Sequence, residues 1–333
     1  MRSVFLSNQL HTLPEVYAPE TVETLVREAG ADREFYDDAA IRSTPDGFRD
    51  VECIFSTWGM PTYTEEEIRR FFPSLRAVFY AAGSVQFFAR PFLACGVRVF
   101  SAWAANGVPV AEYTTALVIL ANKGFFRTAP AMSRGDLADA RSAFSEIGGN
   151  YGQRVGIIGA GMIGKMVIRM LKAYRLEVVV CDPFLPDETA RELGVSKCGL
   201  AELFATCDVI TNHLANNAET RGMLNYALFA SMKRNAAFLN TGRGAQVVES
   251  DLIRVLTERS DLTAILDVTD PEPPAADSPF YRLPNCILTP HIAGSRGLEF
   301  HRMSEYMLAE FRRWKDCVAC PYEVTLPMLA TMA

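Results

Sequence analysis

The sequence lacks the features that would direct a protein to a membrane or to secretion. Its longest apolar runs, such as residues 114–122 and 178–181, fall well short of the roughly 20 residues that a membrane-spanning helix needs. The first residues, MRSVFLSNQLHTLPEVY, contain no apolar core of a signal peptide. We therefore expect a cytoplasmic protein with no membrane partner.

An excess of positive charge is also lacking. The 333 residues include 33 Lys and Arg against 39 Asp and Glu, which gives a net charge of −6. Nucleic-acid binding needs clustered cations that release counterions from the phosphate backbone, so we expect no nucleic-acid partner. Any attraction for an anionic small molecule must come from local cationic groups.

Cysteine and histidine do not cluster. Of eight cysteines, only Cys317 and Cys320 form a CxxC pair, and no second Cys or His pair stands nearby to complete a tetrahedral zinc site. We therefore expect no metal site and mostly structural or surface thiols. The role of Cys317 and Cys320 stays open.

The composition is that of a globular chain, with 49% hydrophobic and 22% charged residues, and its length predicts about two domains. Short apolar runs alternate with longer amphipathic stretches, which is typical of parallel strands joined by helices. The sequence thus predicts an α/β fold. In the first hundred residues we expect strands at 3–6, 53–56, 77–81 and 97–101, and helices at 19–28, 64–71 and 88–95. Thr64 and Glu67 form a capping-box pattern.

A long helical pattern starts at Val110, and a polar stretch follows it to Gly152. A second α/β series begins at Arg154. It predicts a strand at 155–159, a helix at 162–174, a strand at 177–181, further strands near Val209, Ala237, Ala264 and Ile287, and a last helix at 299–314.

The segment RVGIIGAGMIG places Gly159, Gly161 and Gly164 between a predicted strand and a predicted helix. The first glycine allows a tight turn, the second lets a pyrophosphate approach the backbone, and the third lets helix and strand pack closely. Met162 and Ile163 open the helix, whose N-terminus favours a phosphate charge. This pattern predicts a dinucleotide site.

Asp182 stands at the end of the next predicted strand, where a carboxylate can accept hydrogen bonds from the adenosine ribose. It would repel a 2′-phosphate, and the following Pro183, Phe184 and Leu185 provide no cation to bind one. NAD is therefore the expected cofactor. The alternative role for Asp182 is to cap the loop after its strand.

Three further segments hold polar residues: LNTGRGAQVVESDL contains Arg243, LDVTDPEPP contains Asp267 and Glu272, and LTPHIAGS contains His291. With the glycine segment before them, they make the region from about Gly156 to Gly294 resemble the D-isomer-specific 2-hydroxyacid dehydrogenase family. The resemblance is weaker over the first hundred residues. There GSVQFFA replaces a more polar GxDNID-like run, and Phe88 stands where the family usually has Asp.

Reduction of a 2-oxo acid requires a hydride at C2, a proton for the carbonyl oxygen and a cation for the carboxylate. The resemblance implies that His291 donates the proton, with Glu272 as its partner, because a nearby carboxylate favours the imidazolium. Arg243 would bind the carboxylate and the carbonyl oxygen through its planar fork. Taken singly, these residues also fit a structural histidine, a turn acid and a loop cation.

The resemblance also implies that Asp267 holds the nicotinamide carboxamide, although a strand-end Asp is a common structural feature. The loop TNHLANNAETRG would pass near the nicotinamide ribose, with His213 a loop residue rather than a catalyst. The remaining expected cofactor contacts are Thr220, Thr241, Gly242, Arg243, His291 and Gly294.

For the substrate, the resemblance implies that Ala82 and Gly83 present backbone amides to the carboxylate and that the loop at 56–63 covers its other side. That loop holds Trp58, which would contact substrate or simply pack in the core. It contains no Arg or Lys, which argues against a phosphorylated substrate.

The implied architecture is a Rossmann-type doubly wound domain at 105–294, which binds NAD, and a flavodoxin-like substrate domain from 1–104 and 295–333, with the cleft between them. A homodimer around the helix near 110–122 is expected. The predicted function is NADH-dependent reduction of a small unphosphorylated 2-oxo acid, such as glyoxylate, hydroxypyruvate, pyruvate or a larger analogue, to its D-2-hydroxy acid. The alternatives are a phosphite- or phosphoglycerate-type dehydrogenase and a non-catalytic NAD-sensing interaction protein.

Overall fold

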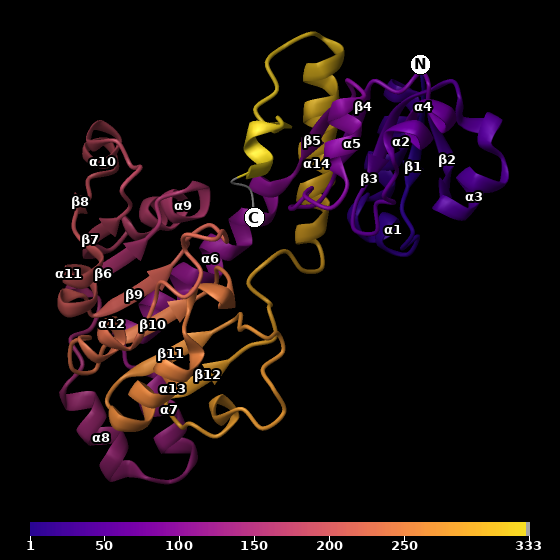
Figure 1. Ribbon diagram of the computed structural model, residues 1–333. Helices are drawn as coiled ribbons and strands as arrows, with labels where there is room; N and C mark the ends of the chain where they lie inside the picture. Colours follow the sequence, from indigo (N-terminus) through magenta and orange to yellow (C-terminus); the bar gives the residue numbers. More distant parts are fainter. Residues whose placement is uncertain (331–333) are drawn as a thin grey trace. The chain divides into compact units, whose positions relative to one another are not determined.

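The computed structural model describes residues 1–330, and the chain divides into two compact units. Unit 1 comprises Met1–Gly107 and Ser295–Ala333, and unit 2 comprises Val108–Gly294. Each unit is built on one largely parallel sheet with helices around it, which confirms the predicted α/β class (Figure 1).

Unit 1 has the sheet order β13-β5-β4-β3-β1-β2, in which only β13 is antiparallel to its neighbour. The order 2-1-3-4-5 of the parallel strands is the flavodoxin-like order. The strands are β1 Arg2–Leu6, β2 Ala31–Tyr36, β3 Val51–Ser56, β4 Ala77–Tyr80, β5 Arg98–Ser101 and β13 Glu323–Val324. The helices are α1 Thr12–Val16, α2 Pro19–Ala29, α3 Asp38–Ser43, α4 Glu65–Phe71, α5 Ala89–Ala94 and α14 Glu299–Lys315.

Both faces of the unit 1 sheet are buried, as expected for parallel strands with apolar runs. On one face Phe79 stacks on Phe55 and Phe100, with ring centroids 5.2 and 4.8 Å away. Phe311 and Trp314 of α14 meet the same ring edge-on at 5.7 and 5.9 Å. The chain's last helix thus completes the core that its first strands begin.

Two strands of unit 1 are not predicted by the sequence. The strand β2, with the residues ADREFY, lies at a sheet edge and is mostly exposed or half-buried, so it shows little apolar patterning. The two-residue β13 depends on a distant ion pair, in which Arg98 donates to both Glu323 oxygens at 2.7 and 2.6 Å. The predicted capping box of α4 is confirmed by reciprocal bonds between Thr64 and Glu67.

Unit 2 has an all-parallel sheet of order β12-β11-β10-β9-β6-β7-β8. Counted within the unit, this is the doubly wound order 3-2-1-4-5-6 with one more strand at the edge. The strands are β6 Tyr151–Ile158, β7 Arg175–Cys181, β8 Ser196–Lys197, β9 Val209–Asn212, β10 Ala237–Asn240, β11 Thr263–Leu266 and β12 Cys286–Leu288. The helices are α7 Phe125–Ser133, α8 Leu137–Ser145, α9 Met162–Leu171, α10 Asp187–Leu193, α11 Leu200–Thr206, α12 Tyr226–Ala230 and α13 Glu249–Glu258, and α6 (Trp103–Asn122) enters the unit from unit 1.

The helix α6 begins at Trp103, so the predicted start at Val110 is wrong. A proline lacks the N–H that a helix interior needs, so the sequence pattern places the helix start after Pro109. The structure nevertheless includes Pro109 within the helix. Among the described residues, α6 alone is long and apolar enough to cross a membrane, but 56% of that window is buried inside the protein. Its apolar composition is therefore typical of a core helix.

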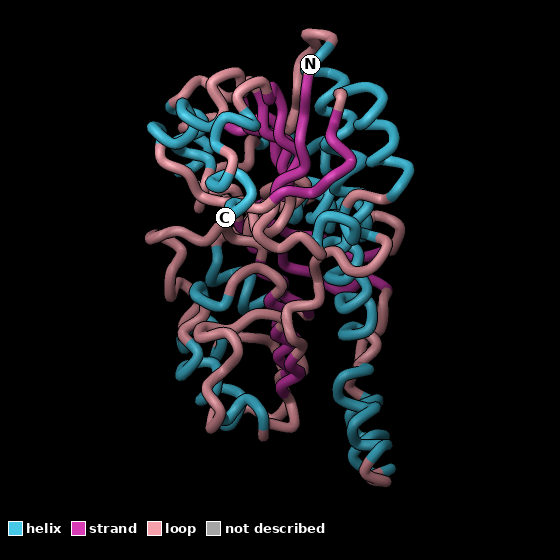
Figure 2. Tube along the Cα trace, turned by 90° about the vertical axis from the view of Figure 1, so that its right-hand side faces the viewer, coloured by secondary structure: helices cyan, strands magenta, loops and turns pink. Residues whose placement is uncertain are grey.

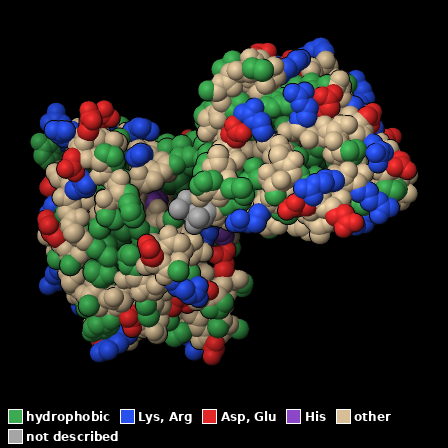
Figure 3. Space-filling model, turned by 45° about the horizontal axis from the view of Figure 1, so that its top comes forward, with side chains coloured by type: hydrophobic (Ala, Val, Ile, Leu, Met, Phe, Trp, Pro, Cys, Tyr) green, Lys and Arg blue, Asp and Glu red, His purple; other side chains and the backbone are tan. Residues whose placement is uncertain are grey.

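The polar stretch after α6 folds into α7 and α8, which Figure 2 shows as a helical hairpin (cyan) at one edge of unit 2. On the molecular face seen in Figure 3, acidic and basic side chains are interspersed over both units. This distribution agrees with the small negative net charge.

Candidate active site

The candidate site lies at the carboxyl edge of the unit 2 sheet. The strands β6 and β9 are neighbours, while the chain proceeds from β6 to β7 on the other side. Ligands of open α/β sheets bind outside the carboxyl ends of the strands at such a switch point. The predicted site segments follow β6, β7, β9, β10, β11 and β12, six adjacent parallel strands.

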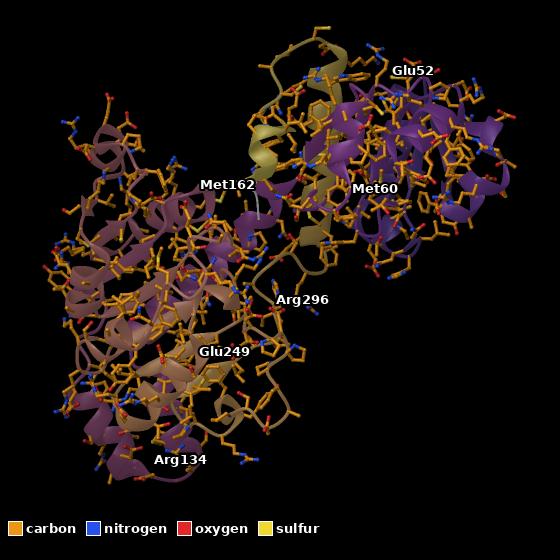
Figure 4. The ribbon with its side chains drawn as sticks, in the orientation of Figure 1. Glu52, Met60, Arg134, Met162, Glu249 and Arg296 are labelled. Atoms are coloured by element: carbon orange, nitrogen blue, oxygen red, sulfur yellow. The ribbon has the colours of Figure 1, made fainter. Side chains whose placement is uncertain are left out.

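The glycine turn after β6 has the geometry that a dinucleotide requires. Gly159 has a φ of 86°, and a Cβ there would lie 2.8 Å from the His213 carbonyl oxygen. A Cβ on Gly164 would lie 2.1 Å from the Gly159 carbonyl oxygen, whereas one on Gly161 would meet nothing within 4 Å. The open space at Gly161 adjoins the first turn of α9, which Met162 and Ile163 begin. Figure 4 labels Met162 at this position. First-turn N–H groups have no intrahelical acceptor, so the turn fits a pyrophosphate.

Alanine substitutions should separate the two glycine roles. Gly164→Ala should destabilise the fold by about 3 kcal/mol, since the added methyl group meets a backbone carbonyl. Gly161→Ala should leave the melting temperature unchanged but weaken NADH binding by at least about tenfold, because its methyl group occupies the pyrophosphate space. Thermal unfolding and fluorescence titration with NADH measure the two effects. Equal NADH affinity in Gly161→Ala and the unmodified protein would place the pyrophosphate elsewhere.

Asp182 follows β7 and is half-buried beside this turn. One oxygen accepts from the Ala160 N–H at 2.7 Å and the other accepts from the Phe184 N–H at 2.8 Å. The carboxylate therefore ties the glycine turn to its own loop, as the capping alternative proposes. Each oxygen keeps a second lone pair for a ligand.

The loop after β9 adjoins the glycine turn, since the His213 N–H donates to the Ile158 carbonyl at 2.7 Å. The His213 ring contacts the Thr211 hydroxyl at 3.1 Å, and desolvation lowers the pKa of His213 to about 4. A neutral imidazole suits a loop residue better than a proton donor. The Thr220 hydroxyl donates to the Ala215 carbonyl at 2.6 Å and accepts from the Asn217 N–H, so Thr220 shapes the loop.

The turn after β10 carries Thr241, Gly242 and Arg243. The Thr241 hydroxyl pairs with the Thr114 hydroxyl of α6 at 2.9 Å, and Gly242 packs closely against the Asn212 carbonyl. The Arg243 side chain is half-buried and donates through Nη1 to the Gly242 carbonyl at 2.8 Å. Within residues 1–330 it forms no ion pair, so most of the guanidinium fork remains available for an anionic ligand.

Asp267, which follows β11, is buried and organises the segment after β12. Its carboxylate accepts from the Thr289 hydroxyl at 2.5 Å and from the Ile292 and Ala293 N–H groups at 2.9 Å each. Gly294 follows and ends unit 2. Asp267 thus holds the loop that carries His291, which is the kind of structural role considered for a strand-end Asp.

His291 and Glu272 form a direct pair, with 2.6 Å between Nδ1 and Oε1. Both side chains are partly exposed, 48% and 42% respectively, so the other ring nitrogen can reach a ligand. His291 has a φ of 53°, a left-handed conformation that costs a non-glycine residue about 1–3 kcal/mol. Its N–H donates to the Asp267 and Thr289 carbonyls, which hold this strained backbone in place.

The predicted substrate residues Ala82, Gly83 and Trp58 belong to unit 1. The buried Ser101 hydroxyl reaches the Ala82 and Gly83 carbonyls at 3.0 and 2.5 Å. In the described part of the chain the N–H groups of Ala82 and Gly83 have no protein acceptor. The Trp58 ring is half-buried and packs edge-on against Phe300 at 5.2 Å, which agrees with its core-packing alternative.

The structure therefore joins His291 to Glu272, the His291 segment to Asp267, and the glycine turn to both Asp182 and the His213 loop. Sequence reasoning missed three buried amides at the same sheet edge, Asn212, Asn240 and Gln246. For Asn212 and Asn240 the sequence did hold a signal, since each ends an apolar run, VITN and AFLN. An Asn that ends an apolar strand is a candidate for a buried hydrogen bond.

The fold and this edge of the sheet define a dinucleotide-binding α/β protein. Residues 115–293, more than half of the chain, match the NAD binding domain of the D-isomer specific 2-hydroxyacid dehydrogenase family. The chain belongs to this family.

Known relatives share this region. D-3-phosphoglycerate dehydrogenase of Methanocaldococcus jannaschii is 34% identical over 201 residues, which is 60% of this chain but 38% of that relative. The chain therefore spans well under half the length of this relative. Among solved structures, D-mandelate dehydrogenase of Rhodotorula graminis has a TM-score of 0.80 at 19% identity, over 97% of both chains. A phosphoglycerate oxidoreductase from Rhizobium etli has a TM-score of 0.79 at 20% identity, over 98% of this chain and 99% of the other. These two likenesses concern the fold alone.

Proposed function

We propose that this protein is an NADH-dependent reductase that converts a small unphosphorylated 2-oxo acid to its D-2-hydroxy acid. The observation that carries the proposal is the His291–Glu272 pair at 2.6 Å, at the same sheet edge as an arginine with no ion-pair partner in residues 1–330. Family membership supports the reaction class.

In the proposed reaction each polar residue has one task. The Arg243 fork binds the substrate carboxylate and carbonyl oxygen, which orients C2 and stabilises the negative charge that develops on the oxygen. NADH, when bound, supplies the hydride. His291 donates a proton to the carbonyl oxygen. Glu272 accepts a hydrogen bond from the His291 Nδ1–H and so orients the ring, and Asp267 holds the His291 segment. The products are the 2-hydroxy acid and NAD.

NAD rather than NADP is the proposed cofactor, because Asp182 would face the adenosine ribose and no cation follows it before residue 186. Asp182→Asn removes the negative charge and keeps the size of the side chain. The ratio of NADPH to NADH affinity should rise by about tenfold or more, since repulsion of a 2′-phosphate is lost. Titration with both nucleotides measures this ratio. Asp187→Asn, an 85% exposed acid in the same segment, is the matched control and should leave the ratio unchanged.

We propose that unit 2 binds the cofactor and carries Arg243 and His291, and that unit 1 also contributes to substrate binding. In unit 1 the N–H groups of Ala82 and Gly83, which have no acceptor among the described residues, suit a carboxylate, and the loop at 56–63 has no cation for a phosphate. Trp58 would contribute an apolar contact. Phosphoglycerate- and phosphite-type chemistry remain the alternatives within the family, the former supported by the relative from Methanocaldococcus jannaschii.

A homodimer is the proposed assembly. Helices α6 to α8 expose several large apolar side chains, which would be covered in a dimer. These side chains are Leu120, Phe125, Met132, Leu137 and Phe144. Light scattering at micromolar concentration tests the assembly.

Location in the cytoplasm and the absence of nucleic-acid, membrane and metal partners stay predictions from the sequence.

The activity is tested by NADH oxidation with a panel of 2-oxo acids: glyoxylate, hydroxypyruvate, pyruvate, larger analogues and 3-phosphohydroxypyruvate, with phosphite and NAD as a separate arm. We expect turnover with an unphosphorylated acid and production of the D isomer. Faster turnover of the phosphorylated acid would favour the phosphoglycerate type. NADH binding without any turnover would instead support the NAD-sensing alternative.

A further inference from the structure

Three carboxamide side chains lie buried side by side behind the candidate site. Asn212 ends β9, Asn240 ends β10, and Gln246 lies in the 3-10 turn Gly244–Gln246; their exposed fractions are 0%, 1% and 0%. Burying an amide is unfavourable unless its donors and acceptors are paired. We call these three residues the amide triad.

The triad is bonded internally across the sheet. Asn212 and Asn240 are register partners on adjacent strands, and Asn212 Nδ2 donates to Asn240 Oδ1 at 3.0 Å. The same nitrogen donates to Gln246 Oε1 at 2.7 Å. Asn212 therefore links the other two amides.

The outer bonds of the triad all go to the backbone of two segments. Toward the loop after β9, Gln246 Nε2 donates to the Leu214 and Ala215 carbonyls at 3.0 and 3.1 Å. On the same loop, Asn212 Oδ1 accepts from the Leu214 N–H at 3.2 Å. The loop that carries His213 is thus held on its backbone by two amides.

Toward the turn after β10, the triad holds both backbone polar groups of Arg243, its N–H and its carbonyl. Asn240 Nδ2 donates to the Arg243 carbonyl at 2.9 Å, and Gln246 Oε1 accepts from the Arg243 N–H at 3.3 Å. Asn240 Oδ1 also accepts from the Gly242 N–H at 3.1 Å. These contacts fix the position from which the guanidinium extends.

We propose that the amide triad positions Arg243 and the loop after β9 together, so that the substrate-binding cation and a cofactor-binding loop share one rigid support. This inference rests on the proposed function. Asn212, Asn240 and Gln246 are positioning residues, since they act on ligands only through the backbone that they hold. A buried network in which every amide nitrogen and oxygen has a partner is rigid, and small displacements of a binding group carry a large kinetic cost.

Asn285 provides a matched control because it is a similar amide in a different place. It is 8% exposed and donates through Nδ2 to the carbonyls of Leu256, Leu262 and Arg259. It immediately precedes β12, so it lies at the amino edge of the sheet, opposite the candidate site. Loss of its side chain removes buried hydrogen bonds without touching either segment.

The test compares Gln246→Met with Asn285→Ala by thermal unfolding, NADH titration and steady-state kinetics. Both variants should lower the melting temperature. Only Gln246→Met should raise the NADH dissociation constant, by about tenfold for the two lost carbonyl bonds. It should also lower kcat/KM by about 100-fold, with a fall in kcat as well as a rise in KM, because Arg243 is displaced.

Two outcomes would overturn the proposal: a Gln246→Met protein with unchanged NADH affinity and kinetics, or an Asn285→Ala protein with the same losses. If Gln246→Met does not fold, Asn212→Ser, which removes the internal link, carries the test with the same expected direction. A protein that turns over no acid would refute the proposed function. The NADH titration of the variants would still decide whether the triad supports the loop.

Discussion

His291→Ala should lower kcat for 2-oxo acid reduction by about 10²- to 10⁴-fold, the usual contribution of a positioned proton donor. The Nδ1 atom of His291 is paired with Glu272, which leaves Nε2 for the substrate oxygen. NADH affinity should change little, since the glycine turn and Asp182 do not depend on the imidazole. Single-turnover kinetics under saturating NADH separate this chemical effect from cofactor binding.

The control for this substitution is His11→Ala, an exposed histidine of unit 1 that has no bond to the predicted site residues. It should retain full activity. Glu272→Gln should also lower kcat, because a neutral amide orients the His291 ring less firmly than the carboxylate that pairs with Nδ1 at 2.6 Å. Full activity of His291→Ala would remove this residue from the role of proton donor.

Arg243→Ala should lower kcat/KM by about 10³-fold, through the loss of two charge-assisted hydrogen bonds to the substrate. Within residues 1–330 its guanidinium bonds to one backbone carbonyl and forms no ion pair, so the substitution removes ligand contacts rather than a protein ion pair. Arg243→Lys should recover little of the loss, since an ammonium keeps the charge but not the planar fork. Kinetics at saturating NADH measure both variants.

Arg282→Lys is the matched control, because Arg282 is an exposed arginine of the same unit. It should leave kcat/KM unchanged. The melting temperature of Arg243→Ala should also stay close to that of the unmodified protein. If Arg243→Lys were as active as the unmodified protein, bidentate binding of the substrate would be excluded.

Much of the fold could be read from the chain because parallel strands buried on both faces have continuous apolar runs. The strands β1, β3 to β7 and β9 to β12 all lie where such runs predict them. The strands β2, β8 and β13 lie at sheet edges and carry polar residues, so apolar runs do not predict them.

In the candidate site, too, some residues can be predicted from the sequence and others cannot. Gly159 and Gly164 are predictable because their geometry depends on a few neighbouring residues, and backbone atoms occupy the space where a side chain would lie. The amide triad is not predictable, because Asn212, Asn240 and Gln246 acquire their roles only when two strands pair and a turn folds over them.

By itself, the sequence determined the α/β class, the glycine turn and the order of the polar segments, since each depends on local periodicity or on a short motif. The tertiary structure adds the 2.6 Å distance between His291 and the Glu272 that the resemblance names as its partner, and it alone decided that Asp267 supports the His291 segment. It also decided that α14 completes the core of unit 1. These contacts join residues that are far apart in the chain. They form because adjacent parallel strands, connected through helices, bring their carboxyl ends to the same edge of the sheet.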